Sequence, residues 1–187
     1  MKKEFGLYIH IPFCRQKCFY CDFPSFAGRE KKIDKYLQAL EQEFALLRQR
    51  VHSKDNARDT ESKFAPRTIY IGGGTPTALN DHQLEKLLEI VQKYVAVAEA
   101  EEFTVEMNPG TVDREKLLLL QQAGVNRLSV GVQSFDDHCL QKIGRIHTAQ
   151  DAVNTIELAH NLGFDNISLD LIYGLPQQDR EILTQSV

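Results

Sequence analysis

The chain has 187 residues, of which 42% are hydrophobic and 26% charged, and its formal net charge is −4. This composition is typical of a globular domain, and it argues against a nucleic-acid partner, which usually requires a basic surface. No apolar run approaches the roughly 18 residues of a membrane span and the N-terminus lacks a signal-peptide pattern, so we expect a cytoplasmic protein.

Short apolar strands alternate with amphipathic helices along the chain. The expected strands are 7–11, 68–71, 103–106, 128–132 and 167–172. Apolar residues at helical spacing predict helices at about 33–47, 84–95, 114–123, 149–162 and from 180 onward. Asp113 and Thr148 are placed to cap two of these helices, and Gly124 and Gly163 to end them.

Strands that alternate with helices predict an α/β fold with a parallel sheet. Five such units without a GxGxxG turn favour a barrel or partial barrel over a doubly wound sheet. Residues 50–66 are polar, and we expect a solvated loop or a frayed helix end there. Because the chain stops where a helix begins, at 178–187, we expect residues 1–187 to be one domain at the N-terminal end of a longer protein.

Three cysteines follow the first strand within eight residues, as Cys14, Cys18 and Cys21. Three thiolates at such spacing are able to hold three irons of a [4Fe–4S] cluster, which leaves the fourth iron open. Zinc is the alternative, but structural zinc prefers four ligands in two pairs, and only His10 offers a fourth ligand here. The cluster is favoured over zinc or ordinary core cysteines, whereas the distant Cys139 is expected to be a buried apolar residue.

Six motifs in order resemble the radical S-adenosylmethionine (SAM) superfamily, and within it the oxygen-independent coproporphyrinogen III oxidase family. The motifs are YIHIPFC at 8–14, GGGTPT at 72–77, EMNP at 106–109, NRLSVGVQSF at 126–135, GRIH at 144–147 and DLIYGLP at 170–176. The resemblance runs from about Leu7 to Gln178, and it implies a TIM-like partial (β/α) barrel truncated after about five units.

The resemblance also implies the cofactors and their ligands. Cys14, Cys18 and Cys21 would ligate a [4Fe–4S] cluster whose open iron is chelated by SAM. One-electron cleavage of SAM to methionine and a 5′-deoxyadenosyl radical would need a reducing protein such as flavodoxin or ferredoxin. No catalytic side chain is assigned. The implied SAM-binding residues are Tyr8, Tyr20, Gly72, Gly73, Gly74, Thr75, Glu106, Gln133, Arg145 and Asp170.

Two departures from the oxidase separate the branches of this family. Phe23 occupies the position of a further cysteine in the oxidase, and only about five residues precede the first strand. Both features indicate the HemW-type heme chaperone branch, with heme or a porphyrin as ligand and part of its role dependent on a C-terminal domain. Two enzymatic alternatives stay open, which are oxidative decarboxylation of coproporphyrinogen III and radical chemistry on an unrelated substrate.

Overall fold

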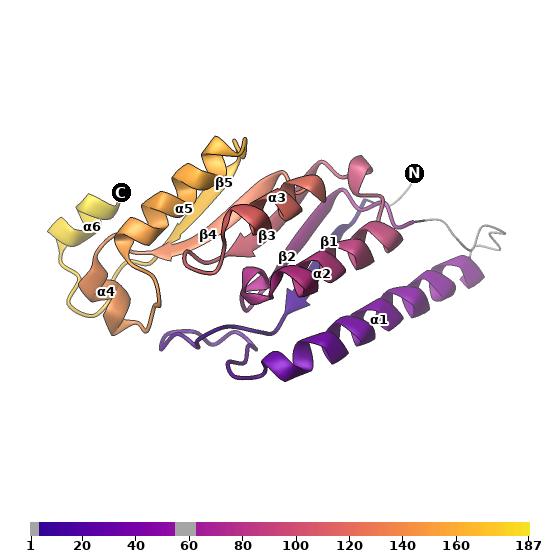
Figure 1. Ribbon diagram of the computed structural model, residues 1–187, viewed down its shortest axis with the longest axis horizontal. Coiled ribbons are helices and arrows are strands. Elements are labelled where there is room, and N and C mark those ends of the chain that lie inside the picture. The colour runs from indigo at the N-terminus through magenta and orange to yellow at the C-terminus, as the bar shows by residue number, and fades with distance from the viewer. Residues whose placement is uncertain (1–3, 55–62) are drawn as a thin grey trace.

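The computed structural model of the chain describes residues 4–54 and 63–187. Five parallel strands form one sheet in the order β1-β2-β3-β4-β5 (Figure 1). Their bounds are β1 Gly6–Ile11, β2 Thr68–Gly73, β3 Glu102–Met107, β4 Arg127–Gln133 and β5 Ile167–Leu171. This sequential order is that of a barrel wall, whereas a doubly wound sheet reverses direction at a switch point. The predicted partial barrel is therefore confirmed.

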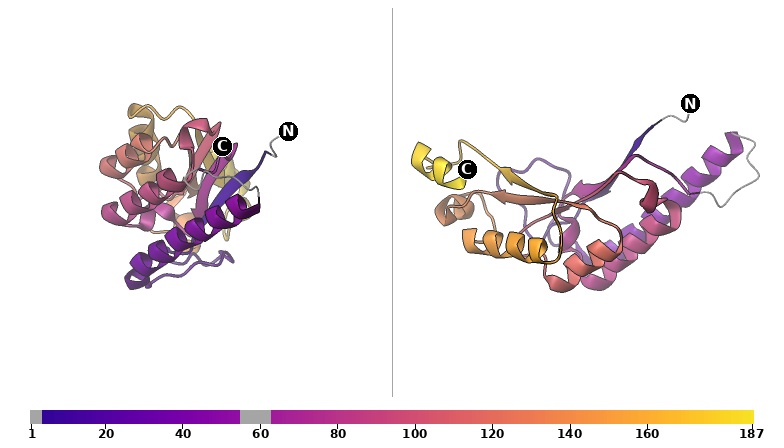
Figure 2. Two further views of the ribbon diagram at one scale, coloured as in Figure 1. Left: turned by 90° about the vertical axis from the view of Figure 1, so that its right-hand side faces the viewer. Right: turned by 90° about the horizontal axis from the view of Figure 1, so that it is seen from above.

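The helices lie mainly on one face of the sheet, as the right-hand view of Figure 2 shows. They are α1 Ile33–Lys54, α2 Asp81–Tyr94, α3 Arg114–Gln122, α4 Asp137–Lys142, α5 Ala149–Asn161 and α6 Arg180–Ser186, with the 3₁₀ turns η1 Glu30–Lys32, η2 Pro76–Ala78 and η3 Val97–Glu99. None of these described helices has the length and apolarity needed to cross a membrane.

The predicted helix ends are confirmed. The Asp113 side chain accepts from the backbone N–H of Lys116, and Thr148 and Asp151 form a capping box. Gly124 and Gly163 follow α3 and α5 with positive φ angles of 90° each. Of the polar segment 50–66, the part up to Lys54 is helical, and 55–62 lie outside the described residues.

Alternation along the strands separates an apolar face from a polar face. Ile9, Ile71, Val105 and Val130 belong to the set that is buried in the core against the helices. The intervening positions carry polar groups, and these pair across the sheet, as Tyr70 with Glu106 and Ser129 with Asp170. The face away from the helices is therefore chemically equipped for a polar site.

The loop after β1 is anchored beside the carboxyl ends of the strands. The backbone N–H of Cys14 donates to the carbonyl of Phe26 at 3.1 Å, and the N–H of Phe26 donates to the carbonyl of Pro12 at 2.9 Å. The next strand holds the same loop, because the N–H of Thr75 donates to the carbonyl of Phe13 at 2.8 Å. The three cysteines of this loop thus lie at the edge where parallel-sheet enzymes place their chemistry.

Candidate functional site

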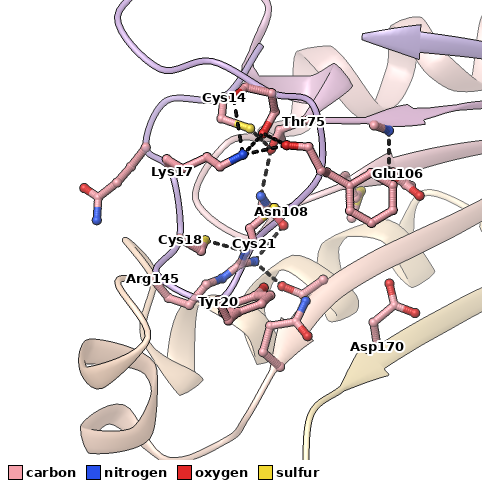
Figure 3. Close-up of a pocket in the computed structure, with 18 of the residues that line it drawn as sticks. Cys14, Lys17, Cys18, Tyr20, Cys21, Thr75, Glu106, Asn108, Arg145 and Asp170 are labelled. Atoms are coloured by element: carbon pink, nitrogen blue, oxygen red, sulfur yellow. Dashed lines mark hydrogen bonds between the residues drawn. The ribbon is translucent and has the colours of Figure 1, made fainter. Parts of the chain in front are cut away.

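The predicted site residues come mostly from separate strand ends, and the structure brings them to one cavity (Figure 3). Of those named from the sequence, the residues that line it are Cys14, Cys18, Tyr20, Cys21, Gly73, Gly74, Thr75, Glu106, Gln133, Arg145 and Asp170. The cavity volume of about 190 Å³ is below the roughly 300–1,000 Å³ of typical small-molecule sites. The described residues would therefore enclose a cofactor of that size only in part.

Lys17 fixes the shape of the cysteine loop from inside it. Its ammonium donates to the carbonyl of Phe23 at 2.5 Å and to the hydroxyl of Ser25 at 3.2 Å. Ser25 is 6% exposed, so the loop closes on a buried anchor. The loop is also held by the C-terminal end of α4, because the N–H of Phe19 donates to the carbonyl of Ile143 at 3.0 Å.

A chain of hydrogen bonds connects two of the cysteines across three strand ends. The Thr75 hydroxyl donates toward the Cys14 sulfur at 3.7 Å, and the Asn108 amide donates to the Thr75 hydroxyl at 2.9 Å. The Arg145 guanidinium donates to Asn108 Oδ1 at 2.6 Å and to the Cys18 sulfur at 3.5 Å. The Cys14 and Cys18 sulfurs therefore each lie beside a polar donor from a neighbouring element.

Asn108 and Lys17 were not assigned a role from the sequence. Asn108 lies inside the EMNP motif, so its place two residues after Glu106 was the available signal. Lys17 carries no such signal, because its partners are a carbonyl and a hydroxyl six and eight residues further along the loop.

Glu106 connects β3 with the glycine-rich end of β2. One carboxylate oxygen accepts from the Tyr70 hydroxyl at 2.7 Å, and the other accepts from the backbone N–H of Gly73 at 2.9 Å. A carboxylate has about four acceptor positions, so Glu106 retains capacity for a further donor in the cavity. Burial, with Glu106 as its hydrogen-bond partner, raises the pKa of Tyr70.

The glycines after β2 fit closely against the protein itself. A Cβ at Gly74 would lie 2.6 Å from the carbonyl oxygen of Phe13, and one at Gly73 would overlap the His10 ring. Atoms of β1 and the cysteine loop therefore fill the space beside the Cα atoms of Gly73 and Gly74. Both glycines also line the cavity.

Tyr8 and Gly72 are not among the described residues that line the cavity. Tyr8 stacks on Tyr70, with ring centroids 5.9 Å apart, and its hydroxyl lies 3.1 Å from Nδ1 of His10. A Cβ at Gly72 would lie 2.7 Å from the Glu106 carboxylate, so any larger residue at this position would displace the Glu106 side chain. Gly72 therefore lies beside a residue of the cavity wall, whereas Tyr8 is separated from it by Tyr70, which donates to Glu106.

Tyr20 and Arg145 both lie close to the Cys18 sulfur. Burial raises the pKa of Tyr20 to about 12, so its phenol stays protonated as a donor. The Nε of Arg145 is buried and has no hydrogen-bond partner among the described residues. An unpaired buried donor on a side chain that contacts the Cys18 sulfur matches a site completed by a ligand with acceptor atoms.

The donor set therefore fits an iron–sulfur cluster with an organic ligand. Within the described residues, no three His, Cys, Asp or Glu side chains gather around one point as a single metal ion would require. A cubane places each cysteine on a different iron, so its ligands need not converge on one point. Cys139 lies outside the site, fully buried against Ile143 and Leu175.

Comparison with known proteins relates the chain to one superfamily. The sequence matches the Radical SAM superfamily over residues 8–185. It is 45% identical over 181 residues to the heme chaperone HemW of Bacillus subtilis and 43% identical over 177 residues to that of Escherichia coli. These matches cover 96% and 94% of this chain but 45% and 44% of the relatives, so the chain spans less than half of their length.

The fold is also found in a solved structure. Coproporphyrinogen III oxidase (HemN) of Escherichia coli, described as a radical SAM enzyme, superposes with a TM-score of 0.83 and 31% identity. The superposition covers 98% of this chain and 40% of that one. The shared fold therefore extends over nearly the whole of this chain.

Proposed function

The chain belongs to the radical SAM superfamily, and on this basis we propose that Cys14, Cys18 and Cys21 hold a [4Fe–4S] cluster beside bound SAM. Superfamily membership implies these two cofactors, and the assignment to individual residues is ours. The main support is the single cavity that unites the three cysteines with the polar ends of the neighbouring strands. When bound, the cluster and SAM supply one-electron chemistry that protein side chains lack.

The residues of the chain have separate tasks in this proposal. Thr75 and Arg145 each donate toward a cysteine sulfur and orient Cys14 and Cys18 toward the cavity. Glu106 and the unpaired Nε of Arg145 offer an acceptor and a donor to the polar groups of SAM. Gln133 and Asp170 complete the cavity wall, and Tyr20 covers the sulfurs on one side. An external reductant such as flavodoxin or ferredoxin would deliver the electron in the cytoplasm.

For the whole protein we propose a role as a heme chaperone of the HemW type. Identity to the HemW relatives, 45% and 43%, exceeds the 31% identity to the oxidase. Phe23, at the position of the further oxidase cysteine, lines the cavity and is 58% exposed. An exposed phenylalanine supplies apolar area for a flat ligand, whereas selective radical chemistry benefits from a closed site.

The oxidase is the second candidate, and parallel assays separate the two. The protein is reconstituted anaerobically and tested for heme binding by absorbance, and for oxidation of coproporphyrinogen III with SAM and a strong reductant. We expect heme to bind and coproporphyrinogen to persist. Protoporphyrinogen formed at roughly 0.01 s⁻¹ or faster, which is still slow for an enzyme, would reject the chaperone role and favour the oxidase.

A further inference from the structure

The carboxyl end of β4 departs from regular strand geometry inside the candidate site. Gly131 pairs with Asp170 and Gln133 with Leu171, so two steps along β4 match one step along β5. Val132 is therefore the extra residue of a β-bulge. Gln133, which lines the cavity, has a φ of 71°, in the left-handed region that residues other than glycine rarely adopt.

Three successive carbonyls at this bulge accept hydrogen bonds from three different donors. The Arg145 guanidinium donates to the carbonyl of Gly131, and the backbone N–H of Ile172 donates to the carbonyl of Gln133 at 3.0 Å. Between them, the ring Nε2 of His147 lies 3.2 Å from the carbonyl of Val132. The carbonyl of a bulge residue lacks a regular ladder partner, so the imidazole satisfies a group that the strand leaves unpaired.

His147 is buried and has the protonation state that this contact requires. It is 3% exposed. Burial, followed by the neighbouring charge of Arg145, lowers its pKa to about 4, although Asp151 and Asp137 act in the opposite direction. At neutral pH the ring therefore carries one proton. Because a carbonyl only accepts, that proton lies on Nε2, and Nδ1 has no partner among the described residues.

Two alternate residues of the segment 144–148, Arg145 and His147, thus contact backbone carbonyls of β4. Arg145 contacts the carbonyl before the bulge residue, and His147 contacts the carbonyl of the bulge residue itself. A left-handed glutamine costs free energy and persists only where its surroundings hold it. Of the two side chains that donate here, Arg145 lines the cavity and His147 does not, so holding the bulge is the role that remains for His147.

We propose that His147 is a positioning residue that holds the Val132 carbonyl and thereby keeps Gln133 in its left-handed conformation, facing bound SAM. This inference rests on the proposed SAM site, and it adds a residue that does not itself contact the cofactor. Its substitution should impair SAM binding without removing the cluster, because the cysteine loop lies on a different element.

The test compares His147→Leu, which removes the donor, with His147→Gln, whose amide replaces Nε2–H. Iron content, the dissociation constant of SAM and the φ of Gln133 in crystal structures are measured on the reconstituted protein. We expect His147→Leu to keep about four irons, to bind SAM about tenfold more weakly and to lose the positive φ. His147→Gln should restore most of the affinity and the positive φ.

Two results would overturn the proposal. One is unchanged SAM affinity or an unchanged Gln133 φ in His147→Leu. The other is equal loss in both variants, or loss of iron together with affinity, either of which would make His147 a general packing residue. Failure of the wild-type protein to bind SAM would instead contradict the proposed function, and the crystal structures would still decide whether His147 holds Gln133.

Discussion

The four cysteines of the chain occupy two distinct environments. Cys14, Cys18 and Cys21 are partly exposed and line the cavity, whereas Cys139 is fully buried. Burial, with Asp136 as a further cause, raises the pKa of the Cys139 thiol, which disfavours the metal-binding thiolate. We predict that alanine at any of the three loop positions abolishes the cluster, and that Cys139→Ala retains it.

Iron and sulfide content after anaerobic reconstitution checks this prediction. Full cluster occupancy in Cys14→Ala, Cys18→Ala or Cys21→Ala would reject the ligand set. Loss of iron in Cys139→Ala, with its thermal unfolding unchanged, would identify a ligand that the structure places elsewhere.

Gly74, directly after β2, packs closely against the segment that leads from β1 into the cysteine loop. An added Cβ would lie 2.6 Å from the carbonyl oxygen of Phe13 and 2.8 Å from that of Ile11. These are backbone atoms that cannot turn aside, and they belong to the segment that leads into Cys14. We predict that Gly74→Ala loses most of its iron, because it displaces this segment.

Gly6→Ala is the matched control, since Gly6 lies in β1, which pairs with β2. Its added Cβ would come close to the Thr68 side-chain hydroxyl, at 2.9 Å, while the nearest backbone atom, the Thr68 carbonyl oxygen, is 3.9 Å away. Iron content of both variants is measured after identical reconstitution. Equal occupancy in Gly74→Ala and Gly6→Ala would show that the close approach at β2 does not position the cluster ligands.

At the scale of elements, a buried lysine joins two of the loops that form the rim. The ammonium of Lys116, in the first turn of α3, donates to the carbonyl of Thr77 at 2.9 Å and to that of Thr111 at 3.1 Å. Burial, with Arg15 nearby, lowers the pKa of Lys116. These two loops also carry Thr75 and Asn108, so Lys116 fixes the spacing between site residues of neighbouring strands.

We predict that Lys116→Met lowers the free energy of unfolding by about 1–3 kcal/mol, since it leaves two buried carbonyls without this donor. The exposed Lys86, paired with Glu89 at 3.6 Å, provides the control. Lys86→Met should change stability by less than about 0.5 kcal/mol. Urea unfolding measures both, and equal stability of the two variants would contradict the bridging role of Lys116.

The strands and helix ends were predictable because their determinants are local. Apolar spacing located all five strands, and Asp113, Thr148, Gly124 and Gly163 act at helix ends as expected. The bulge at Val132 was not predictable, because it depends on the register between β4 and β5.

The location of the candidate site was predictable from motifs, but the hydrogen bonds and packing contacts that hold it together were not. Each motif placed residues at one strand end, and the parallel sheet then assembled Cys14, Glu106 and Arg145 in one cavity. The contacts of Lys116 and His147 join groups that are 5 to 39 residues apart in the sequence, and no periodicity records them. The close packing around Gly74 was not predictable for the same reason, since its neighbours belong to β1 and the cysteine loop.

At the scale of the molecule, the core residues and the residues of the candidate site lie on opposite faces of the sheet. Its apolar face packs on the helices, and its polar face carries Tyr70, Glu106, Ser129 and Asp170. Sequential parallel strands bring every carboxyl end to one edge, so substitutions there are expected to alter the site with little effect on the core. This division explains how one 187-residue unit holds the complete set of proposed cofactor ligands.

The most direct test of the central claim is electron paramagnetic resonance of the reduced, anaerobically reconstituted protein, with and without SAM, together with its metal content. We predict about four irons and four sulfides per chain, and a cluster signal that changes when SAM is added, because SAM would bind the iron that lacks a cysteine. Stoichiometric zinc in place of iron, or a cluster signal that SAM leaves unchanged, would contradict the account.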